Sequence, residues 1–215
     1  MMHSELVELR QQDMLSIPGS TADYAYFPID SFISVVLESD GAGGMEVAMV
    51  GNEGMFNTAT VLGATLSTFS ARVQGAGQAI KIHRKAFYMR RTEDARLRNL
   101  LLRYIYVVTS HLAQRVVCIN YHNVEQRLAR SLLMSRDRSN THELFLTHEN
   151  LAFMAGARRE SISHAAGALQ ERGVISYARG YVILLDEPAL ELISCPCYEL
   201  ERNFYERILN AHNTT

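Results

Sequence analysis

The sequence has few cysteines and no long apolar run. Its three cysteines, Cys118, Cys195 and Cys197, are too few and odd in number to form a disulfide framework. Every apolar stretch falls well short of the roughly 20 residues that span a bilayer. Residues 1–17 carry several charged side chains and therefore lack the apolar core of a signal peptide. We therefore expect a cytoplasmic protein with reduced thiols and no membrane partner.

The charges nearly balance, with 21 basic and 23 acidic residues and a net charge of −2. This near-neutral sum alone argues against a nucleic-acid partner, since DNA-binding domains usually carry a basic surface. The distribution along the chain argues the other way. Residues 91–185 hold 13 basic and eight acidic side chains, whereas residues 1–90 and 186–215 are both acidic overall. Only two basic residues are lysines, and arginine favours bidentate contacts.

Residues 24–82 predict β structure, because short runs rich in β-branched and aromatic residues alternate with glycine-bearing turns. The runs are Tyr26–Phe27, Phe32–Leu37, Met45–Val50, Phe69–Val73 and Ala79–Ile82, and the turns lie at 40–44, 51–54 and 75–77. Antiparallel strands need only short connections. The pattern therefore predicts a barrel or a sandwich over residues 1–90.

The pattern changes near residue 90, and neither glycine nor proline occurs from Thr92 to Leu133. Apolar residues follow the alternating spacing of four and three that is typical of a helix–helix contact. They are Leu101, Ile105, Val108, Leu112 and Ile119, with Arg115 interrupting the series. We predict a long helix over residues 91–123 that forms a dimer and also packs on the barrel. A helix buried within one domain is the alternative.

Residues 147–175 have the pattern of a helix-turn-helix. Thr147 is a good N-cap, and Gly156 lies where a tight turn must reverse the chain. A second helix at about 157–171 would bury Ile162, Ala165, Ala166 and Leu169, and small residues at 165–168 would let the helices approach closely. Its exposed N-terminal side chains would be Arg158, Arg159, Glu160, Ser161, Ser163 and His164.

Such a helix suits the major groove of DNA. Arginine donates two hydrogen bonds to guanine, and glutamate accepts one from cytosine. A β-hairpin over residues 174–184 follows directly, with Arg179 at its tip to contact a phosphate. An ordinary helical hairpin with a solvated charged face is the alternative.

These motifs resemble the Crp/Fnr superfamily of bacterial transcription regulators over almost the whole chain. The segments that carry the resemblance are Tyr26–Val35, Met49–Met55, Glu125–Arg130, Leu146–Gly156, Arg159–Ser161 and Gly173–Ile175. The resemblance implies an α+β fold with an antiparallel β-roll (a double-stranded β-helix or jelly roll, similar to cyclic-nucleotide-binding domains) over 1–90. A dimerisation helix over 91–123 and a winged helix-turn-helix with a C-terminal tail over 124–215 would follow. It also implies a homodimer that binds double-stranded DNA at a two-fold symmetric operator and contacts RNA polymerase.

The resemblance also implies roles for single residues. Base reading is assigned to Arg159, Glu160, Ser163 and His164, and phosphate contacts to Thr147, His148, Arg158, Ser161 and Arg179. Relatives usually have an arginine at the position of His164. A neutral imidazole lacks the fork of donors that arginine offers, so the base read there is expected to differ from the usual one.

The effector stays unknown at this point. Members that bind cyclic AMP pair its phosphate with an arginine, and this chain has Phe69 there, with Arg72 three residues later. Without that guanidinium the cost of desolvating the phosphate is not offset, so we do not expect cyclic-nucleotide binding. An iron–sulfur cluster normally needs four cysteines, and none precedes Cys118. A haem or another small ligand is left open, with His83 and His111 as the nearest candidates.

No metal site and no enzyme are predicted. The pair in Cys195–Cys197 could bind a metal or act in redox chemistry, but no histidine lies at zinc-finger spacing, so we interpret it as structural. His122 and Glu125 are interpreted as part of a solvated helix face. His148 and Glu149 lack the second histidine of a zinc protease. The alternative to a DNA-binding regulator is a haem, redox or nucleotide sensor that acts through protein contacts alone.

Overall fold

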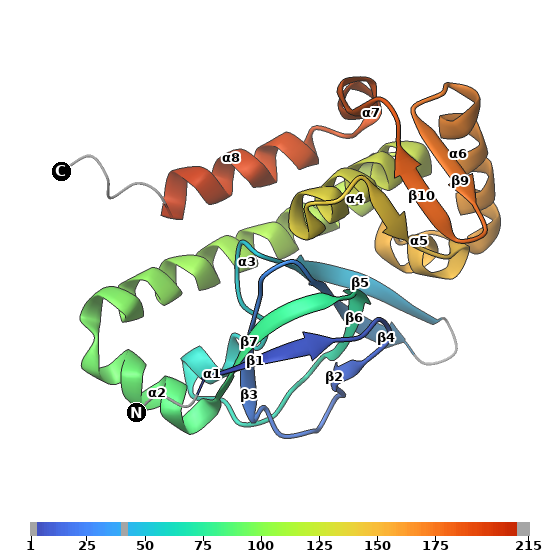
Figure 1. Ribbon diagram of the computed structural model, residues 1–215. Helices are drawn as coiled ribbons and strands as arrows, with labels where there is room; N and C mark the ends of the chain where they lie inside the picture. The colour runs from blue at the N-terminus through green and yellow to red at the C-terminus, as the bar shows by residue number, and fades with distance from the viewer. Residues whose placement is uncertain (1–3, 40–42, 210–215) are drawn as a thin grey trace.

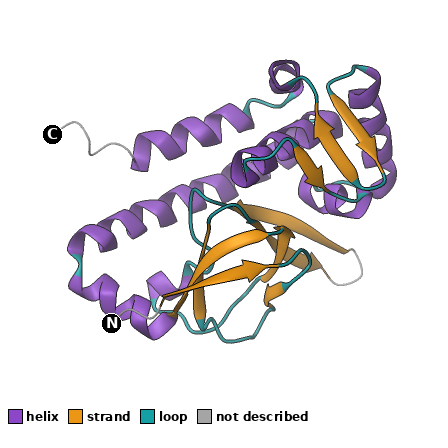
Figure 2. Cartoon of the chain, viewed as in Figure 1, coloured by secondary structure: helices purple, strands orange, loops and turns teal. Residues whose placement is uncertain are grey.

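The computed structural model describes residues 4–39 and 43–209. A β-roll lies on one side of the long helix α3 (Ala95–Tyr121), and a second part, with shorter helices and its own small sheet, lies beyond the end of that helix (Figure 1). The C-terminal helix α8 (Cys197–Leu209) runs back alongside α3. Figure 2 shows that the strands gather in these two places, with helices between them. The predicted α+β fold is confirmed.

The β-roll consists of two antiparallel sheets, of order β1-β7-β3 and β2-β6-β4-β5. Its strands are β1 (Ser4–Leu9), β2 (Met14–Ser16), β3 (Tyr24–Pro28), β4 (Phe32–Ser39), β5 (Gly43–Val50), β6 (Ser70–Gly75) and β7 (Gly77–His83). Inward side chains such as Ile33, Val50 and Val73 form the core between the sheets. A short helix, α1 (Ala59–Leu62), lies in the connection from β5 to β6.

Two strands were absent from the sequence prediction. Strand β1 pairs with β7 along its whole length, and β2 pairs with β6. In β1 the sequence Ser-Glu-Leu-Val-Glu-Leu mixes acidic and apolar residues, and Leu6 is 63% exposed, so the segment carries a weak apolar pattern. Pairing with a strand some 70 residues away defines it. Of the glycine-rich turn predicted at 40–44, residues 40–42 lie outside the described part of the chain.

Helix α3 begins after a clear cap. The Asp94 carboxylate accepts hydrogen bonds from the backbone N–H groups of Arg96 and Leu97, both at 3.0 Å. The preceding helix, α2 (Arg84–Glu93), begins at His83, whose ring nitrogen accepts from the Lys85 backbone N–H. Helix α3 ends at Tyr121, close to the end predicted from the sequence.

The residues predicted to form the dimer contact pack largely within their own chain. Leu101 is only 5% exposed, in a cluster with Met55 and Phe87, and Ile105 and Val108 pack at the edge of that cluster. Leu101 therefore has no surface left for a partner. Leu112 lies beside Val108 where α3 faces the β-roll, and Ile119 lies near the position that a side chain on Gly156 would occupy. The spacing of four and three thus marks the side of α3 that packs inward.

Helix α4 (Val124–Ser139) opens with a capping box in which Asn123 and Gln126 exchange side-chain and backbone hydrogen bonds. The helix includes the polar stretch from Arg136 and extends to Ser139. Arg136 pairs with Glu187, and Arg138 pairs with Glu53, so these polar residues have partners on neighbouring elements. Leu128, Leu132 and Leu133 of α4 form the centre of the second hydrophobic core.

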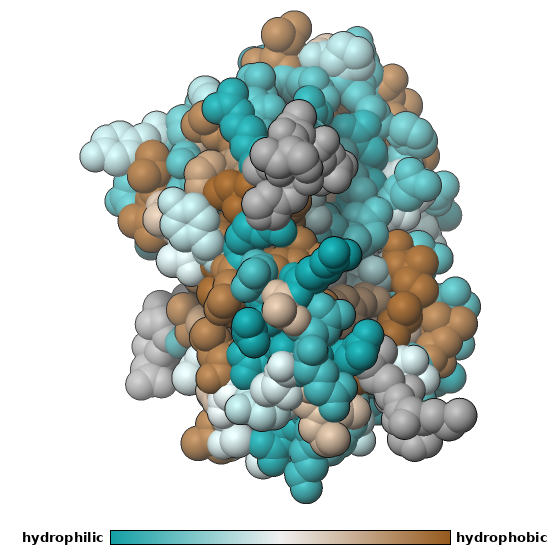
Figure 3. Space-filling model, turned by 90° about the vertical axis from the view of Figure 1, so that its left-hand side faces the viewer, coloured by the Kyte–Doolittle hydropathy of each residue, from teal (hydrophilic) through white to brown (hydrophobic). Residues whose placement is uncertain are grey.

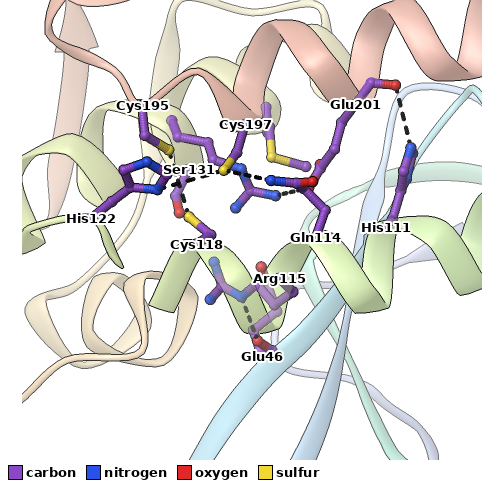
Figure 4. A network of polar contacts seen from close by, with 12 residues as sticks. Glu46, His111, Gln114, Arg115, Cys118, His122, Ser131, Cys195, Cys197 and Glu201 are labelled. Atoms are coloured by element: carbon purple, nitrogen blue, oxygen red, sulfur yellow. Dashed lines mark hydrogen bonds and ion pairs between the residues drawn. The ribbon is translucent and has the colours of Figure 1, made fainter. Parts of the chain in front are cut away.

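One buried arginine connects the two parts of the molecule. Arg115 of α3 donates through Nε to the Glu46 carbonyl oxygen of β5 at 3.2 Å (Figure 4). It also donates through Nη2 to the Met154 carbonyl oxygen. It is 5% exposed, and burial lowers the pKa of its guanidinium. The Glu46 carboxyl group is also buried, which raises its pKa, and it accepts a hydrogen bond from Ser34. Two carbonyl groups from different parts thus depend on one side chain.

Replacing Arg115 by alanine should lower the free energy of unfolding by about 2–4 kcal/mol. The change leaves buried carbonyl oxygens without a donor and opens a cavity. Urea unfolding followed by circular dichroism measures the difference. Arg98→Ala, at an exposed arginine on the same helix, is the control and should change stability little. Equal unfolding curves for wild type and the Arg115 variant would contradict the role of Arg115 in joining the β-roll to the helix-turn-helix part.

Candidate nucleic-acid interface

The first helix of the helix-turn-helix, α5 (His148–Ala155), has the N-cap that the sequence predicts. The Thr147 hydroxyl accepts from the Asn150 backbone N–H at 3.2 Å, and the Asn150 side chain accepts from the Thr147 backbone N–H at 2.9 Å. This reciprocal pair satisfies two backbone donors that the helix itself cannot. Glu149 lies in the first turn, where a negative charge is stabilising.

The turn after α5 depends on Gly156. Its φ of +59° is left-handed, and a Cβ there would lie 3.0 Å from the Met45 sulfur atom. Arg127 of α4 donates to the Gly156 carbonyl oxygen at 3.1 Å and holds the turn against α4. The chain then enters α6 (Arg159–Glu171).

Helix α6 buries one face and exposes the other. Ile162, Ala165, Ala166 and Leu169 are buried, as the sequence predicts. On the other face the side chains of Arg159, Glu160, Ser163 and His164 are exposed, as is Arg158 at the N-cap, while Ser161 is half-buried. Gly167 lies on the exposed face, and a Cβ there would meet nothing. The expectation that Gly167 lets the two helices approach is therefore wrong, whereas Ala165 and Ala166 do lie inside.

A wing follows α6. Strands β8 (Glu143–Phe145), β10 (Tyr181–Leu184) and β9 (Ile175–Ala178) form an antiparallel sheet in that order. Arg179 and Gly180 connect β9 to β10 with φ values of +52° and +85°, as a two-residue hairpin turn requires. The Arg179 side chain is exposed at the tip, as predicted.

The predicted phosphate-contacting residues fall into two groups by exposure. Arg158 and Arg179 are exposed, whereas Thr147, His148 and Ser161 are half-buried. The His148 ring packs against Tyr177 of β9, with centroids 4.8 Å apart, so α5 and the wing are held together. Figure 1 shows α6 and the wing at the end of the molecule that is farthest from the start of α3.

Residues 126–193 match the sequence family described as the Crp-like helix-turn-helix domain. Solved structures agree over nearly the whole chain. FixK2 from Bradyrhizobium japonicum superimposes with a TM-score of 0.73 at 13% identity, over 89% of this chain and 98% of that one. A CRP/FNR-family regulator from Thermus thermophilus gives 0.72 at 20% identity, over 88% and 98%. No curated protein sequence matches.

This chain has the Crp/Fnr fold with a Crp-like helix-turn-helix domain. The c-di-GMP-responsive regulator CLP from Xanthomonas campestris shares that fold, with a TM-score of 0.60 at 17% identity over 85% of this chain and 94% of that one. The predicted Crp/Fnr-type fold is confirmed by these structures, and the predicted helix-turn-helix is confirmed as Crp-like over residues 126–193. No helix among the described residues is long and apolar enough to cross a membrane.

A separate cavity of about 290 Å³ lies between the β-roll and α3. Its lining includes Phe56, Leu66, Phe69, Val108 and Leu112, and among the described residues no charged side chain contributes to it. The phosphate of a nucleotide would find no guanidinium here to offset its desolvation.

The other residues that the sequence suggested for ligand binding lie elsewhere. The guanidinium of Arg72 is 6.0 Å from the ring centre of Phe153 on α5, outside that cavity. His83 caps α2, and the His111 ring contacts the Glu201 carbonyl oxygen at 3.3 Å, so these two candidate haem ligands serve separate local contacts. The cavity therefore favours an apolar ligand over a cyclic nucleotide or a haem ligated by these histidines.

Sequence reasoning missed one group of side chains. Cys118 and His122 at the end of α3 meet Cys195 and Cys197, which lie at the start of α8 and just before it. The spacing of Cys118 and His122 by one helical turn was the available signal, but pairing it with cysteines more than 70 residues away required the tertiary structure.

Two glycines of the helix-turn-helix should respond oppositely to replacement by alanine. Gly156→Ala forces a side chain into a left-handed conformation and should destabilise the protein by about 1–2 kcal/mol. Gly167→Ala adds a methyl group in open space within a helix and should stabilise it by about 0.5–1 kcal/mol. Thermal and urea unfolding measure the stability of both variants. If both substitutions changed the stability in the same direction, the described conformation of Gly156 or the exposed position of Gly167 would be contradicted.

Proposed function

We propose that this chain is a homodimeric transcription regulator that reads a two-fold symmetric DNA site through α6. The observation that carries the proposal is the exposed N-terminal turn of α6, with Arg159 and Glu160 beside an arginine-tipped wing. Among the described residues, Arg159 forms no ion pair, so its guanidinium is available to a base. The N-terminal residues of a recognition helix are those that meet base edges.

The backbone at the start of α6 supports this role. Arg158 occupies the N-cap position but makes no side-chain capping bond, so the first N–H groups of the helix lack that partner. Such a helix terminus is well suited to a phosphate oxygen. The exposed side chains of Arg158 and Arg179 would add charge-assisted contacts. Thr147, His148 and Ser161, which are less exposed, are proposed to contact the phosphate backbone of the DNA as well.

Ser163 and His164 are proposed to face the groove one turn further along. Ser163 donates its hydroxyl hydrogen to the Arg159 carbonyl oxygen at 3.2 Å, which leaves the oxygen as an acceptor toward a base. The absent side chain of Gly167 leaves room on the same face, so the DNA can approach the helix closely. A half-site read by histidine rather than arginine is expected to differ at that base.

Replacing Arg159 by alanine should weaken binding to the selected operator by about 1–3 kcal/mol and relax preference at one base pair. The operator is first selected from random duplexes, and fluorescence anisotropy then gives affinities for it and its single-base variants. Arg172→Ala, at the opposite end of α6, is the matched control. Arg172 pairs with Glu125, and a surface ion pair of this kind contributes little.

Salt dependence separates the two proposed contact types. Arg179→Ala should weaken all duplexes equally and lower the slope of log K against log salt by about 1, since one phosphate contact is lost. Unchanged base preference in Arg159→Ala would contradict its role. A protein that selects no duplex at any salt concentration would favour the alternative, a sensor that acts through protein contacts.

The dimer is proposed to use the outward face of α3. Exposed residues repeat there at intervals of three and four, as in a two-helix contact: Leu102, Tyr106, Thr109, Ala113, Val116 and Asn120. Leu102, Tyr106 and Val116 are 47%, 60% and 62% exposed, which is high for large apolar side chains. Figure 3 shows hydrophobic side chains at the surface, among hydrophilic ones, on the side of the molecule that it displays. Ile105 and Leu112, both half-buried, border this face.

Val116→Glu should convert the dimer to monomers, because a buried unpaired carboxylate costs several kcal/mol. Light scattering after size exclusion measures the mass, and binding to the two-fold site should fall with it. Leu192→Glu on α7 (Glu187–Ile193) is the control, since Leu192 is 89% exposed and lies away from α3. A Val116 variant that remains dimeric would show that the contact lies elsewhere.

A further inference from the structure

The end of α3 and the start of α8 place four soft or nitrogen donors at one point. Cys118 and His122 come from two successive turns at the end of α3, and Cys195 and Cys197 come from the connection between α7 and α8 and the first residue of α8 (Figure 4). Their Sγ and imidazole nitrogen atoms all lie within 4.8 Å of one another. The three cysteines are fully buried, and His122 is half-buried.

The separations fit the edges of a small tetrahedron. The Sγ atoms of Cys118 and Cys195 are 3.5 Å apart, and the Cys197 Sγ atom is 3.6 Å from His122 Nδ1. Zn²⁺ binds thiolate at about 2.3 Å and histidine at about 2.0–2.1 Å in tetrahedral sites, which places neighbouring ligand atoms roughly 3.6–3.8 Å apart. The donors are therefore spaced for one ion.

The surroundings also suit a site that binds through thiolates. Gln114 donates from Nε2 to the Cys197 sulfur at 3.1 Å, a contact that orients a ligand from outside the coordination shell. The Arg130 guanidinium interacts electrostatically with the Cys118 sulfur atom. Arg130 itself is buried and paired with Glu201 at 2.5 Å. Positive charge beside the sulfur atoms offsets part of the negative charge that three thiolates bring.

We propose that Cys118, His122, Cys195 and Cys197 bind a single Zn²⁺ ion in a tetrahedral structural site. All four positions are protein ligands, so the site is closed and holds no water for catalysis. An iron–sulfur cluster would have to lie between the ligands, and donors this close together leave room for one ion only. A disulfide needs sulfur atoms about 2.05 Å apart, which would require the Cys118 and Cys195 side chains to move.

The location assigns the ion a mechanical role. His122 is the C-cap of α3, and α4 begins two residues later, so the site adjoins the junction between the long helix and the helix-turn-helix part. The ion would fix α8 across α3 at that junction. Outside the cluster, contacts from α8 to the β-roll include the hydrogen bond from the Tyr205 hydroxyl to the Glu53 carbonyl oxygen.

Metal analysis of the purified full-length protein tests the proposal. After expression with added zinc and dialysis without chelator, mass spectrometry should find one zinc ion per chain. The Cys197→Ser and His122→Ala variants should each lose most of it. His164→Ala, a histidine outside the cluster, should retain the full content. Circular dichroism and size exclusion establish which variants remain folded.

Cobalt keeps the test decisive if a variant fails to fold. Co²⁺ added to metal-free wild type under reducing conditions should give the intense visible bands of tetrahedral cobalt and thiolate-to-cobalt charge transfer, and zinc should displace it. Removal of zinc with a chelator should lower Tm in wild type.

Three results would overturn the proposal. They are folded wild type that holds no stoichiometric zinc and gives no tetrahedral cobalt spectrum, variants that keep their zinc, and thiol counting that shows a Cys118–Cys195 disulfide in its place.

Discussion

A buried positive charge needs hydrogen-bond acceptors, and Arg115 finds two of them on two different elements, which it joins to its own helix. Its guanidinium on α3 binds carbonyl oxygens of Glu46 in β5 and of Met154 in α5. Since an unpaired guanidinium in this place would cost several kcal/mol, the β-roll, the long helix and the helix-turn-helix are held in one arrangement. A shift of α3 relative to either part would break at least one of these bonds. Any signal passing from the β-roll to α6 therefore has to act on this contact or move all three elements together.

Other polar contacts lie along the same boundary. Arg138 of α4 pairs with Glu53 of the β-roll at 2.9 Å, and Arg130 of α4 pairs with Glu201 of α8. The apolar cavity between the β-roll and α3 adjoins this boundary through Tyr104, whose hydroxyl donates to the Met55 carbonyl oxygen. A ligand in that cavity would press on the side of α3 next to the proposed dimer face. The proposed zinc site lies at the C-terminal end of α3, where the chain passes into α4.

The charge pattern shows how far the sequence can be interpreted without the structure. Residues 91–185 are rich in arginine, and that excess suggested a DNA-binding middle. Arg115, Arg127, Arg130 and Arg138 from this segment are buried, where they hold elements together. The surface proposed to contact DNA depends instead on the few exposed arginines at α6 and at the wing tip. The count of arginines was correct, but it combined those that hold elements together with those proposed to contact DNA. Only the burial of each side chain distinguishes the two groups.

Local patterns determined the helix-turn-helix, the wing and the long helix, because caps, turn glycines and apolar spacing act within a few residues. Thr147, Gly156 and the Arg179–Gly180 turn lie where the sequence placed them. The tertiary structure decided what the apolar face of α3 packs against, the pairing of β1 with β7, and the meeting of Cys118 with Cys195. Each depends on contacts between residues about 70 or more positions apart or on burial by another element, and neither leaves a periodic signal in the chain.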